Sequence, residues 1–466
     1  MDALDLARWQ FGITTVYHFL FVPITIGTSF LVAIMQTAWV RTGNERWLRL
    51  TKFYGKLFLI NFAMGIVTGI VQEFQFGMNW SSYSRFVGDI FGAPLAIEGL
   101  VAFFLESTFL GLWIFGWDRL PKRVHLATIW LAAIGTLLSA YFILAANSWM
   151  QHPVGYEYNA DAGRAELNDF AAVLTNKVAL VTVPHTIFAA FLTAGAFVAG
   201  IAMWRLIRRP DEDREAFRSA LRLGAATVLI AGVGTAVSGD FQAKIMTDVQ
   251  PMKMAAAEAL YDDAQPASFS ILTIGSLNGN EEVFSIRIPR LLSFLAEGDP
   301  NAEVRGINDI QAEYEQTYGE GNYKPNIPVT YWTFRLMIGM GGLAVLAALW
   351  MLWATRKGRT PTSRWLLAAA VLLPFLPLLA NSFGWIFTEM GRQPWIVFGL
   401  MPTSAGVSPG TTAAEVITSM SVFTLLYGGL AVVEVGLLLK YIRAGLPEVE
   451  PTEPGESDER PMAFAY

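Results

Sequence analysis

Nine long apolar segments divide the chain, and each is long enough to cross a lipid bilayer as a helix. A spanning helix needs about 20 mostly apolar residues, because it rises about 1.5 Å per residue through a hydrocarbon core about 30 Å thick. The segments cover residues 10–38, 53–76, 93–117, 124–148, 178–204, 219–239, 329–353, 365–388 and 417–440. This pattern predicts an all-α, polytopic integral membrane protein with nine transmembrane helices in one bundle.

The basic residues of the connecting segments indicate the orientation. Clusters of Lys and Arg follow the first, third, fifth, seventh and ninth segments, whereas the other short loops hold only isolated basic residues. Short cytoplasmic loops carry the excess of positive charge, so the N-terminus is expected outside and the C-terminus in the cytoplasm. The first ten residues lack the basic region and cleavage site of a signal peptide, so the first span should remain in the mature protein.

The segments also predict the domain organisation. Residues 1–239 hold the first six spans and residues 329–445 the last three. Residues 240–328 form one large extracytoplasmic loop, in which PMKMAAAEALYDDA predicts a helix over residues 251–264. A loop this long is usually functional or disordered. Residues 446–466, rich in Pro and Glu, are expected to be a disordered cytoplasmic tail.

Composition excludes several classes of function. A chain that is 53% hydrophobic and 15% charged fits a membrane protein. Its net charge of -6 and its lack of a basic stripe argue against nucleic-acid binding. There is no cysteine, which excludes disulfides, thiolate metal sites and cysteine nucleophiles.

Glutamates within the apolar segments are the first candidates for chemistry. Glu98 and Glu106 both lie in the segment 93–117. Eight residues on a helix give a net rotation of about 80° and a rise of about 12 Å, so both carboxyls share one side at two depths. Intramembrane acids are costly and their default interpretation is functional, although hydrogen bonding to neighbouring helices is the alternative. Glu434 lies deeper, near the inner face, so protonatable groups extend inward as a proton supply from the cytoplasm requires.

Only four histidines occur, and two of them lie within spans. His18 and His185 are each about 10–12 Å from the outer end of their span. Neutral imidazole is an axial heme ligand, and methionine often supplies the second ligand, which makes Met337 a candidate with Arg335 available for heme propionates. The alternatives are a histidine bonded to another helix and a methionine of the core. His125 is expected at the inner surface, and His152 lies at a loop edge.

Depth supports a shared site for these residues. His18, His185, Met337, Glu98 and Glu389 come from five different segments, and all of them lie in the outer half of the predicted bundle. Polar residues that serve packing alone would not be expected to gather at one depth.

Eight stretches together resemble subunit I of the cytochrome bd family of quinol:oxygen oxidoreductases, over essentially the whole chain. They are QFGITTVYHFLFVP, QEFQFGMNWSSYSRFVGDIFG, PLAIEGLVAFFLEST, ANSWMQHPVG, TVPH, KMAAAE, YWTFRLM and GWIFTEMGRQPW. The resemblance implies a nine-helix bundle with three hemes near the outer face. The outer loop is similar to the shorter version found in the family.

The resemblance also implies roles for single residues. His185 and Met337 would ligate a low-spin heme b, supported by Arg335. His18 and Glu389 would ligate a high-spin heme b and a heme d, in an order that the sequence leaves open. Further heme-site residues would be Arg392, Trp385 and Glu98, the last as another candidate iron ligand.

For proton and quinol chemistry, the resemblance implies Glu106 on a proton route toward Glu98, and Lys253 with Glu258 in the quinol-binding motif. Without the resemblance, Lys253 and Glu258 would be read as a solvated pair on a surface helix. The implied protein is a non-pumping terminal oxidase of the bacterial plasma membrane. It would contain subunit II and, in some members, a small single-helix subunit, with menaquinol and ubiquinol both open as substrate.

The number and spacing of the histidines argue against two other classes of heme protein. A heme-copper oxidase needs more than four histidines, and a cytochrome b of the complex III type needs spans with paired histidines, which are absent. A cofactor-free transporter or proton channel using Glu98 and Glu106 is the rival from another class. It predicts internal repeats and midplane sites, whereas the polar cluster is off-centre and no repeat is found. A structural subunit that merely binds heme is the third possibility.

Overall fold

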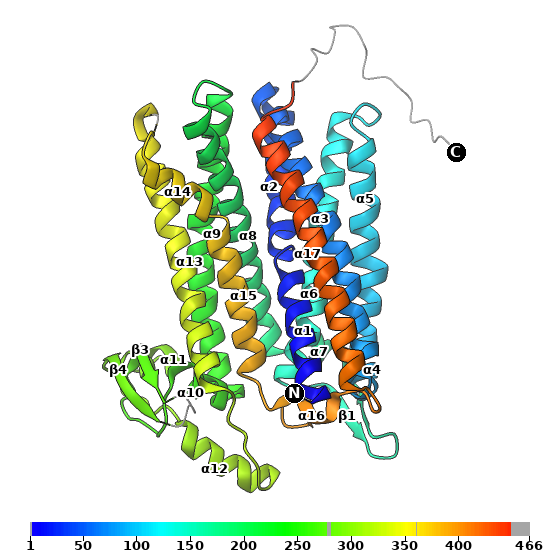
Figure 1. The fold of residues 1–466 in the computed structure, drawn as a ribbon, viewed down its shortest axis with the longest axis vertical. Helices are drawn as coiled ribbons and strands as arrows, with labels where there is room; N and C mark the ends of the chain where they lie inside the picture. The colour runs from blue at the N-terminus through cyan, green and yellow to red at the C-terminus, as the bar shows by residue number, and fades with distance from the viewer. Residues whose placement is uncertain (1, 277–280, 360, 449–466) are drawn as a thin grey trace.

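The computed structural model describes residues 2–276, 281–359 and 361–448. Within these ranges, nine helical segments are long and apolar enough to cross a membrane, which confirms the predicted fold class. Figure 1 shows them as one bundle of roughly parallel rods, with the N-terminus at one end and the end of the last span at the other. We call the end that carries the N-terminus the outer end, following the predicted orientation.

Several spans contain a break. The nine spans are formed by α1 (Ala3–Phe19) with α2 (Val22–Thr42); α3 (Glu45–Met78); α4 (Ser81–Ile97), a π-helical turn (Glu98–Phe103) and α5 (Phe104–Phe115); α6 (Lys122–Gln151); α7 (Phe170–Leu174) with α8 (Lys177–Arg208); α9 (Arg214–Val249); α13 (Ile327–Thr355) with a 3-10 turn (Arg356–Gly358); α14 (Arg364–Leu372) with α15 (Phe375–Met390); and α17 (Ala413–Ala444). Pro374 separates α14 from α15, because a proline lacks the backbone donor that a continuous helix needs.

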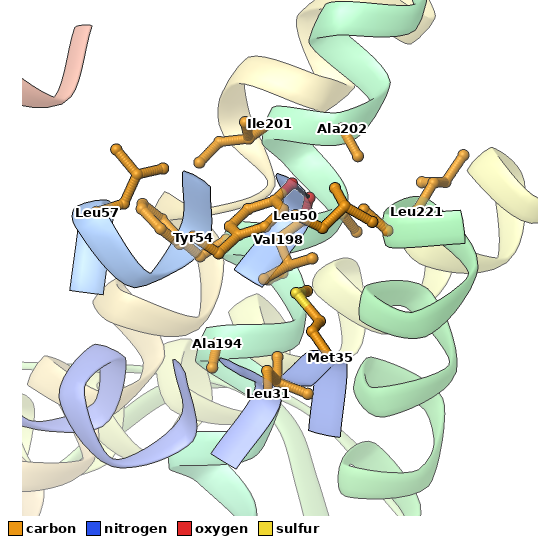
Figure 2. Close-up of a cluster of buried hydrophobic side chains, with 14 of the residues drawn as sticks. Leu31, Met35, Leu50, Tyr54, Leu57, Ala194, Val198, Ile201, Ala202 and Leu221 are labelled. Atoms are coloured by element: carbon orange, nitrogen blue, oxygen red, sulfur yellow. Dashed lines mark hydrogen bonds between the residues drawn. The ribbon is translucent and has the colours of Figure 1, made fainter. Parts of the chain in front are cut away.

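α8 lies at the centre of the bundle. It packs against α2, α6, α9 and α14, and most of its span is buried, whereas α17 is mostly exposed. Toward the inner ends, side chains from α2, α3, α8 and α9 interlock into one apolar core (Figure 2). Tyr54 is the polar member of this core, and its hydroxyl donates to the carbonyl of Val198 at 3.1 Å.

α8 and α9 approach closely at two glycines. A Cβ atom at Gly224 would lie 2.7 Å from the backbone nitrogen of Ala199 and 2.7 Å from the carbonyl oxygen of Gly195. Both obstacles are backbone atoms, which cannot move aside without displacing a helix. Small residues at such contacts let membrane helices pack backbone to backbone.

The outer loop folds into a small unit. It contains α10 (Pro251–Glu258), a hairpin of β3 (Phe269–Gly275) and β4 (Glu282–Ile288), α11 (Leu291–Glu297) and α12 (Ile307–Tyr318). Figure 1 shows these elements at the outer end, beside α9 and α13. The helix predicted over residues 251–264 ends at Glu258. Ala259 takes a left-handed conformation there, and the next residues bond to Ile307 and Asn308 at the start of α12 instead.

Shorter elements complete the outer end. They are the strand pairs β1 (Tyr156–Asn159) with β2 (Arg164–Leu167) and β5 (Trp395–Val397) with β6 (Met401–Pro402), and the helix α16 (Thr403–Gly406). At the inner end, the predicted tail begins in ordered structure, since Leu446 is buried and the carbonyl of Pro447 accepts a hydrogen bond from Arg49 at 2.9 Å. The rest of that predicted tail, residues 449–466, lies outside the described residues.

Replacing Gly224 by alanine should destabilise the bundle, because the new methyl group meets backbone atoms of α8. Overpacking of this kind costs about 1–3 kcal/mol, so we expect the thermal unfolding midpoint of the purified complex to fall by several degrees. Gly428→Ala on α17 is the matched control, because nothing lies within 4 Å of the added atom. Equal midpoints for the two variants would contradict the close packing of α8 on α9.

Candidate functional site

The two intramembrane histidines are held in the same way. Nδ1 of His18 lies 2.9 Å from Oγ1 of Thr68 on α3, and Nδ1 of His185 lies 3.2 Å from Oγ of Ser238 on α9. Each hydroxyl also donates to a backbone carbonyl one turn earlier in its own helix. The hydroxyl oxygen is therefore placed to accept the Nδ1 proton, which leaves the Nε2 lone pair of each imidazole for a ligand.

A glycine follows each of these hydroxyl residues and faces the imidazole. A Cβ atom at Gly69 would lie 3.1 Å from Cε1 of His18, and one at Gly239 would lie 3.2 Å from Cε1 of His185. Met337 has a similar neighbour on α15, where a Cβ atom at Gly384 would lie 2.8 Å from its sulfur. The Thr-Gly and Ser-Gly pairs were not singled out in the sequence, although each small residue lies opposite a candidate ligand.

Two arginines at the outer end, Arg392 buried and Arg335 half-buried, are only partly paired. Arg335 donates to Glu258 at 2.6 Å, and Arg392 forms an ion pair with Glu389. In each guanidinium, Nε and one terminal nitrogen are buried with no hydrogen-bond partner among the described residues. Buried donors of this kind are costly unless an acceptor is present, so both arginines are suited to a further anionic group.

α10 presents two buried charges to different parts of the bundle. Lys253 and Glu258 are 5% and 1% exposed, so the interpretation of a solvated surface pair is wrong. Glu258 turns toward α13 and the β3–β4 hairpin, where Arg335 of α13 and the backbone N–H of Ser270 in β3 donate to it. Burial raises the pKa of Glu258, and Arg335 opposes that shift. Lys253 turns the other way, toward α6.

A chain of hydrogen bonds connects Lys253 with Glu389. The Lys253 ammonium donates to Oε1 of Gln151, and Gln151 donates to Oδ1 of Asn147 at 3.4 Å. Asn147 in turn donates to Oε1 of Glu389 at 3.0 Å. Burial, with the nearby Arg392, lowers the pKa of Lys253 to about 7, whereas Glu389 acts to raise it. Gln151 and Asn147 lie in the stretch ANSWMQHPVG, but neither was assigned a role of its own from the sequence, because an uncharged amide near a helix end carries no distinctive signal by itself.

A small cavity adjoins Lys253. It has a volume of about 10 Å³, room for about one water molecule. Its lining includes Arg392, Tyr314, Tyr323 and Trp395. The indole N–H of Trp395 and two guanidinium nitrogens of Arg392 are buried without a partner among the described residues, so two of the lining residues have unsatisfied donors.

α6 also contacts the membrane glutamates. Glu98 begins the π-helical turn, and its carboxylate accepts a hydrogen bond from Ser139 at 2.7 Å. Glu106 is 8% exposed, and a Cβ atom at Gly135 of α6 would lie 3.0 Å from its Cβ. Such π-helical turns occur frequently at functional sites. Glu73 on α3 interacts electrostatically with Glu98 and was missed in the sequence, although it is also an acid inside an apolar segment.

The five residues predicted to share one depth are not joined to one another by hydrogen bonds in the described part of the chain. Two of them are connected through α6 instead, Glu98 through Ser139 and Glu389 through Asn147. Trp385 lies on α15 and stacks on Phe19, which follows His18, with ring centroids 5.4 Å apart. The polar groups therefore line the inside of the bundle from α1 across α6 to α15.

The structure places His125 and Glu434 in buried positions. His125 was expected at the inner surface, and this prediction is wrong, because the side chain is 2% exposed. Its ring lies 2.9 Å from Gln36 and 2.8 Å from the carbonyl of Trp113, so its polar atoms are satisfied inside the bundle. Glu434 is 8% exposed on the otherwise exposed α17, where it interacts electrostatically with Tyr17.

These features fit heme on three grounds. Two imidazoles offer Nε2, small residues face the imidazoles and the methionine sulfur, and two arginines have buried donors left for carboxylates such as heme propionates. Glu389 also keeps lone pairs on both oxygens after accepting its hydrogen bonds, as a further ligand would need.

The chain is similar to known proteins over almost its whole length. The family model described as cytochrome bd terminal oxidase subunit I matches residues 6–446. Cytochrome bd ubiquinol oxidase subunit 1 of Bacillus subtilis (strain 168) is 48% identical, covering 96% of this chain and 94% of the relative. Cytochrome bd-II ubiquinol oxidase subunit 1 of Escherichia coli (strain K12) is 37% identical, covering 97% and 99%.

A solved structure shows the same fold. The bd oxidase from Geobacillus thermodenitrificans matches with a TM-score of 0.85 at 29% sequence identity, covering 95% of this chain and 99% of that chain. With nine spans and these relatives, the protein is a multi-pass protein of the bacterial plasma membrane. The chain belongs to the cytochrome bd terminal oxidase subunit I family.

Proposed function

We propose that this chain oxidises a membrane quinol at its outer end and passes the electrons to hemes inside the bundle, where oxygen is reduced to water. The observation that carries the proposal is that α10 contacts the bundle at two places. Glu258 joins it to Arg335, and Lys253 joins it through α6 to Glu389. A substrate held at α10 therefore lies next to both groups of candidate heme-site residues.

Named residues would hold the hemes. His185 and Met337 would ligate a low-spin heme b, and Arg335 would pair with its propionates. His18 and Glu389 would ligate the high-spin heme b and the heme d, with Arg392 and Trp385 beside them and Glu98 as another candidate ligand. When bound, these hemes supply the electron path and the open iron position for oxygen chemistry.

The quinol chemistry follows from the two charges of α10. Oxidation of a quinol to a quinone releases two electrons and two protons. Glu258 is a buried carboxylate with a raised pKa, so it can accept the two hydroxyl protons one after the other and release each to the outer side. Lys253, with a pKa of about 7, can donate a hydrogen bond to the second quinol oxygen.

Protons consumed in water formation would come from the inner side. Glu106 and Glu98 lie about two helical turns apart beside α6, and Ser139 hydrogen-bonds Glu98. Carboxyls held in hydrocarbon can alternate between protonated and ionised forms and so carry protons inward from solvent. Protons from the quinol leave at the outer side, and the protons consumed in water formation enter from the inner side. The reaction therefore separates charge across the membrane without a pump.

The complete enzyme would contain the family's subunit II, and a small single-helix subunit is also expected. The relatives' names include both ubiquinol and menaquinol, the latter in a putative menaquinol oxidase subunit I of Bacillus subtilis (strain 168) that is 28% identical. Activity measurements should therefore use both quinols.

Glu106→Gln tests the proton route. The amide keeps the size of the side chain but cannot carry a proton, so heme content should be unchanged while quinol-dependent oxygen consumption falls at least roughly tenfold. Glu106→Asp, which keeps the carboxyl, should retain more of the activity. Wild-type oxygen consumption by Glu106→Gln would refute the role of this residue.

Lys253 should make quinol binding depend on pH. The groups facing its ammonium are Arg392, Glu389, Tyr314 and Tyr323. With a pKa of about 7, Lys253 is charged below neutrality and loses its proton as the pH rises, so KM for quinol should increase by about fivefold between pH 7 and pH 8.

The control for this dependence is Lys253→Met, which fills the same space without a charge. Its KM should be high at every pH, with kcat reduced less than kcat/KM. The assignment would be overturned if the variant kept the pH dependence of the wild-type KM.

A further inference from the structure

The β3–β4 hairpin of the outer loop has one polar face, and that face is turned toward the bundle. Ser270 and Thr273 are buried, and both contact the hydroxyl of Tyr331 on α13. That hydroxyl lies 2.7 Å from Oγ of Ser270 and 2.6 Å from the backbone nitrogen of Thr273. Arg287 donates to Glu282 at 2.6 Å and to the carbonyl of Ala259 at the end of α10. The hydrogen-bonding groups of the hairpin thus lie against α10 and α13.

The opposite face is apolar and exposed. The antiparallel register pairs Ile274 with Phe284 and Leu272 with Ile286. Alternate residues of a strand point to one side of a sheet, so these pairs share a face. Ile274, Phe284 and Ile286 are 49%, 52% and 47% exposed. Further exposed apolar residues of the hairpin and of the adjoining α11 are Ile271, Val283, Ile288 and Phe294.

The hairpin lies beside the seventh span and not beyond its end. Tyr331 and Arg335 are four and eight residues into α13, about 6 and 12 Å along the helix axis. The hairpin reaches both, because the Arg335 guanidinium also lies over the ring of Phe269, 4.7 Å from its centroid. Figure 1 shows the hairpin at the edge of the structure, level with the outer ends of α9 and α13.

The exposed face continues a surface that already meets lipid. On α9, Val237 and Phe241 are 54% and 57% exposed, and Trp332 on α13 is 41% exposed. These residues lie near the outer ends of two spans. An exposed apolar patch of this kind on an extramembrane element marks a protein or membrane contact, and continuity with the lipid-facing helices favours the membrane.

We propose that the apolar face of the β3–β4 hairpin is embedded in the outer leaflet, in contact with phospholipid acyl chains beside α9 and α13. Burial of the exposed apolar side chains in lipid stabilises this position, as it does for interfacial helices. The hairpin then separates the lipid from Glu258 and Arg335. This contact does not depend on quinol being the substrate.

The absence of cysteine makes a direct test practical. Phe284→Cys and Ile286→Cys are each labelled with an environment-sensitive fluorophore in the complete complex, reconstituted into phosphatidylglycerol nanodiscs. Quenching is measured with nitroxide lipids, the nitroxide near the headgroup end of the acyl chain, and separately with aqueous iodide. Ile230→Cys on α9 is the lipid-facing control, and Gln316→Cys on the exposed surface of α12 is the aqueous control. Wild-type complex labelled in parallel supplies the background from other subunits.

At both hairpin positions we expect the lipid nitroxide to quench at least about threefold more than at Gln316→Cys, as at an interfacial site. Iodide should quench the hairpin labels less than it quenches the label of Gln316→Cys. Strong iodide quenching with weak lipid quenching would place the hairpin in water and overturn the proposal. Weak quenching by both agents would show that another protein covers this face, which also overturns it.

Discussion

The structure depends on the burial of two opposite charges on one short helix. Lys253 and Glu258 lie almost wholly out of solvent on α10, and a buried charge is tolerated only when it is paired and hydrogen-bonded. Glu258 therefore requires Arg335 on α13, and Lys253 requires Gln151 on α6. These requirements fix the outer loop to two separate spans. The same contacts bring the proposed quinol site next to the proposed heme-binding residues.

α6 connects the parts of the site. Within its outer half it hydrogen-bonds Glu98 through Ser139, Glu389 through Asn147 and Lys253 through Gln151. These three α6 residues are spaced eight and four positions apart, which keeps them near one side of the helix at increasing height. One helix face thus runs from the membrane glutamates to the outer loop. In the proposed function, this face joins the proton-supply side of the reaction to the quinol side.

The sequence predicted the features that depend on local composition. Nine spans and the placement of glutamates and histidines within them follow from runs of apolar residues and from the rise of a helix. Features that depend on contacts between distant segments were not predicted. His125 was placed at the inner surface, because its partners Gln36 and Trp113 lie on other helices. The amides of α6 and the hydroxyls beside the histidines were missed for the same reason. The two-faced hairpin was also missed, since short alternating strands within a mixed loop give only a weak pattern.

In the proposed function, the partly paired arginines and the two imidazoles with open Nε2 positions hold hemes, one of which reacts with oxygen. The most direct measurement is a visible difference spectrum, dithionite-reduced minus oxidised, of the purified complex with and without carbon monoxide. We expect b-type bands together with a chlorin band in the red that shifts when carbon monoxide binds. A well-folded complex with no heme absorbance would contradict the proposed function, and the buried glutamates would then require an explanation without cofactors.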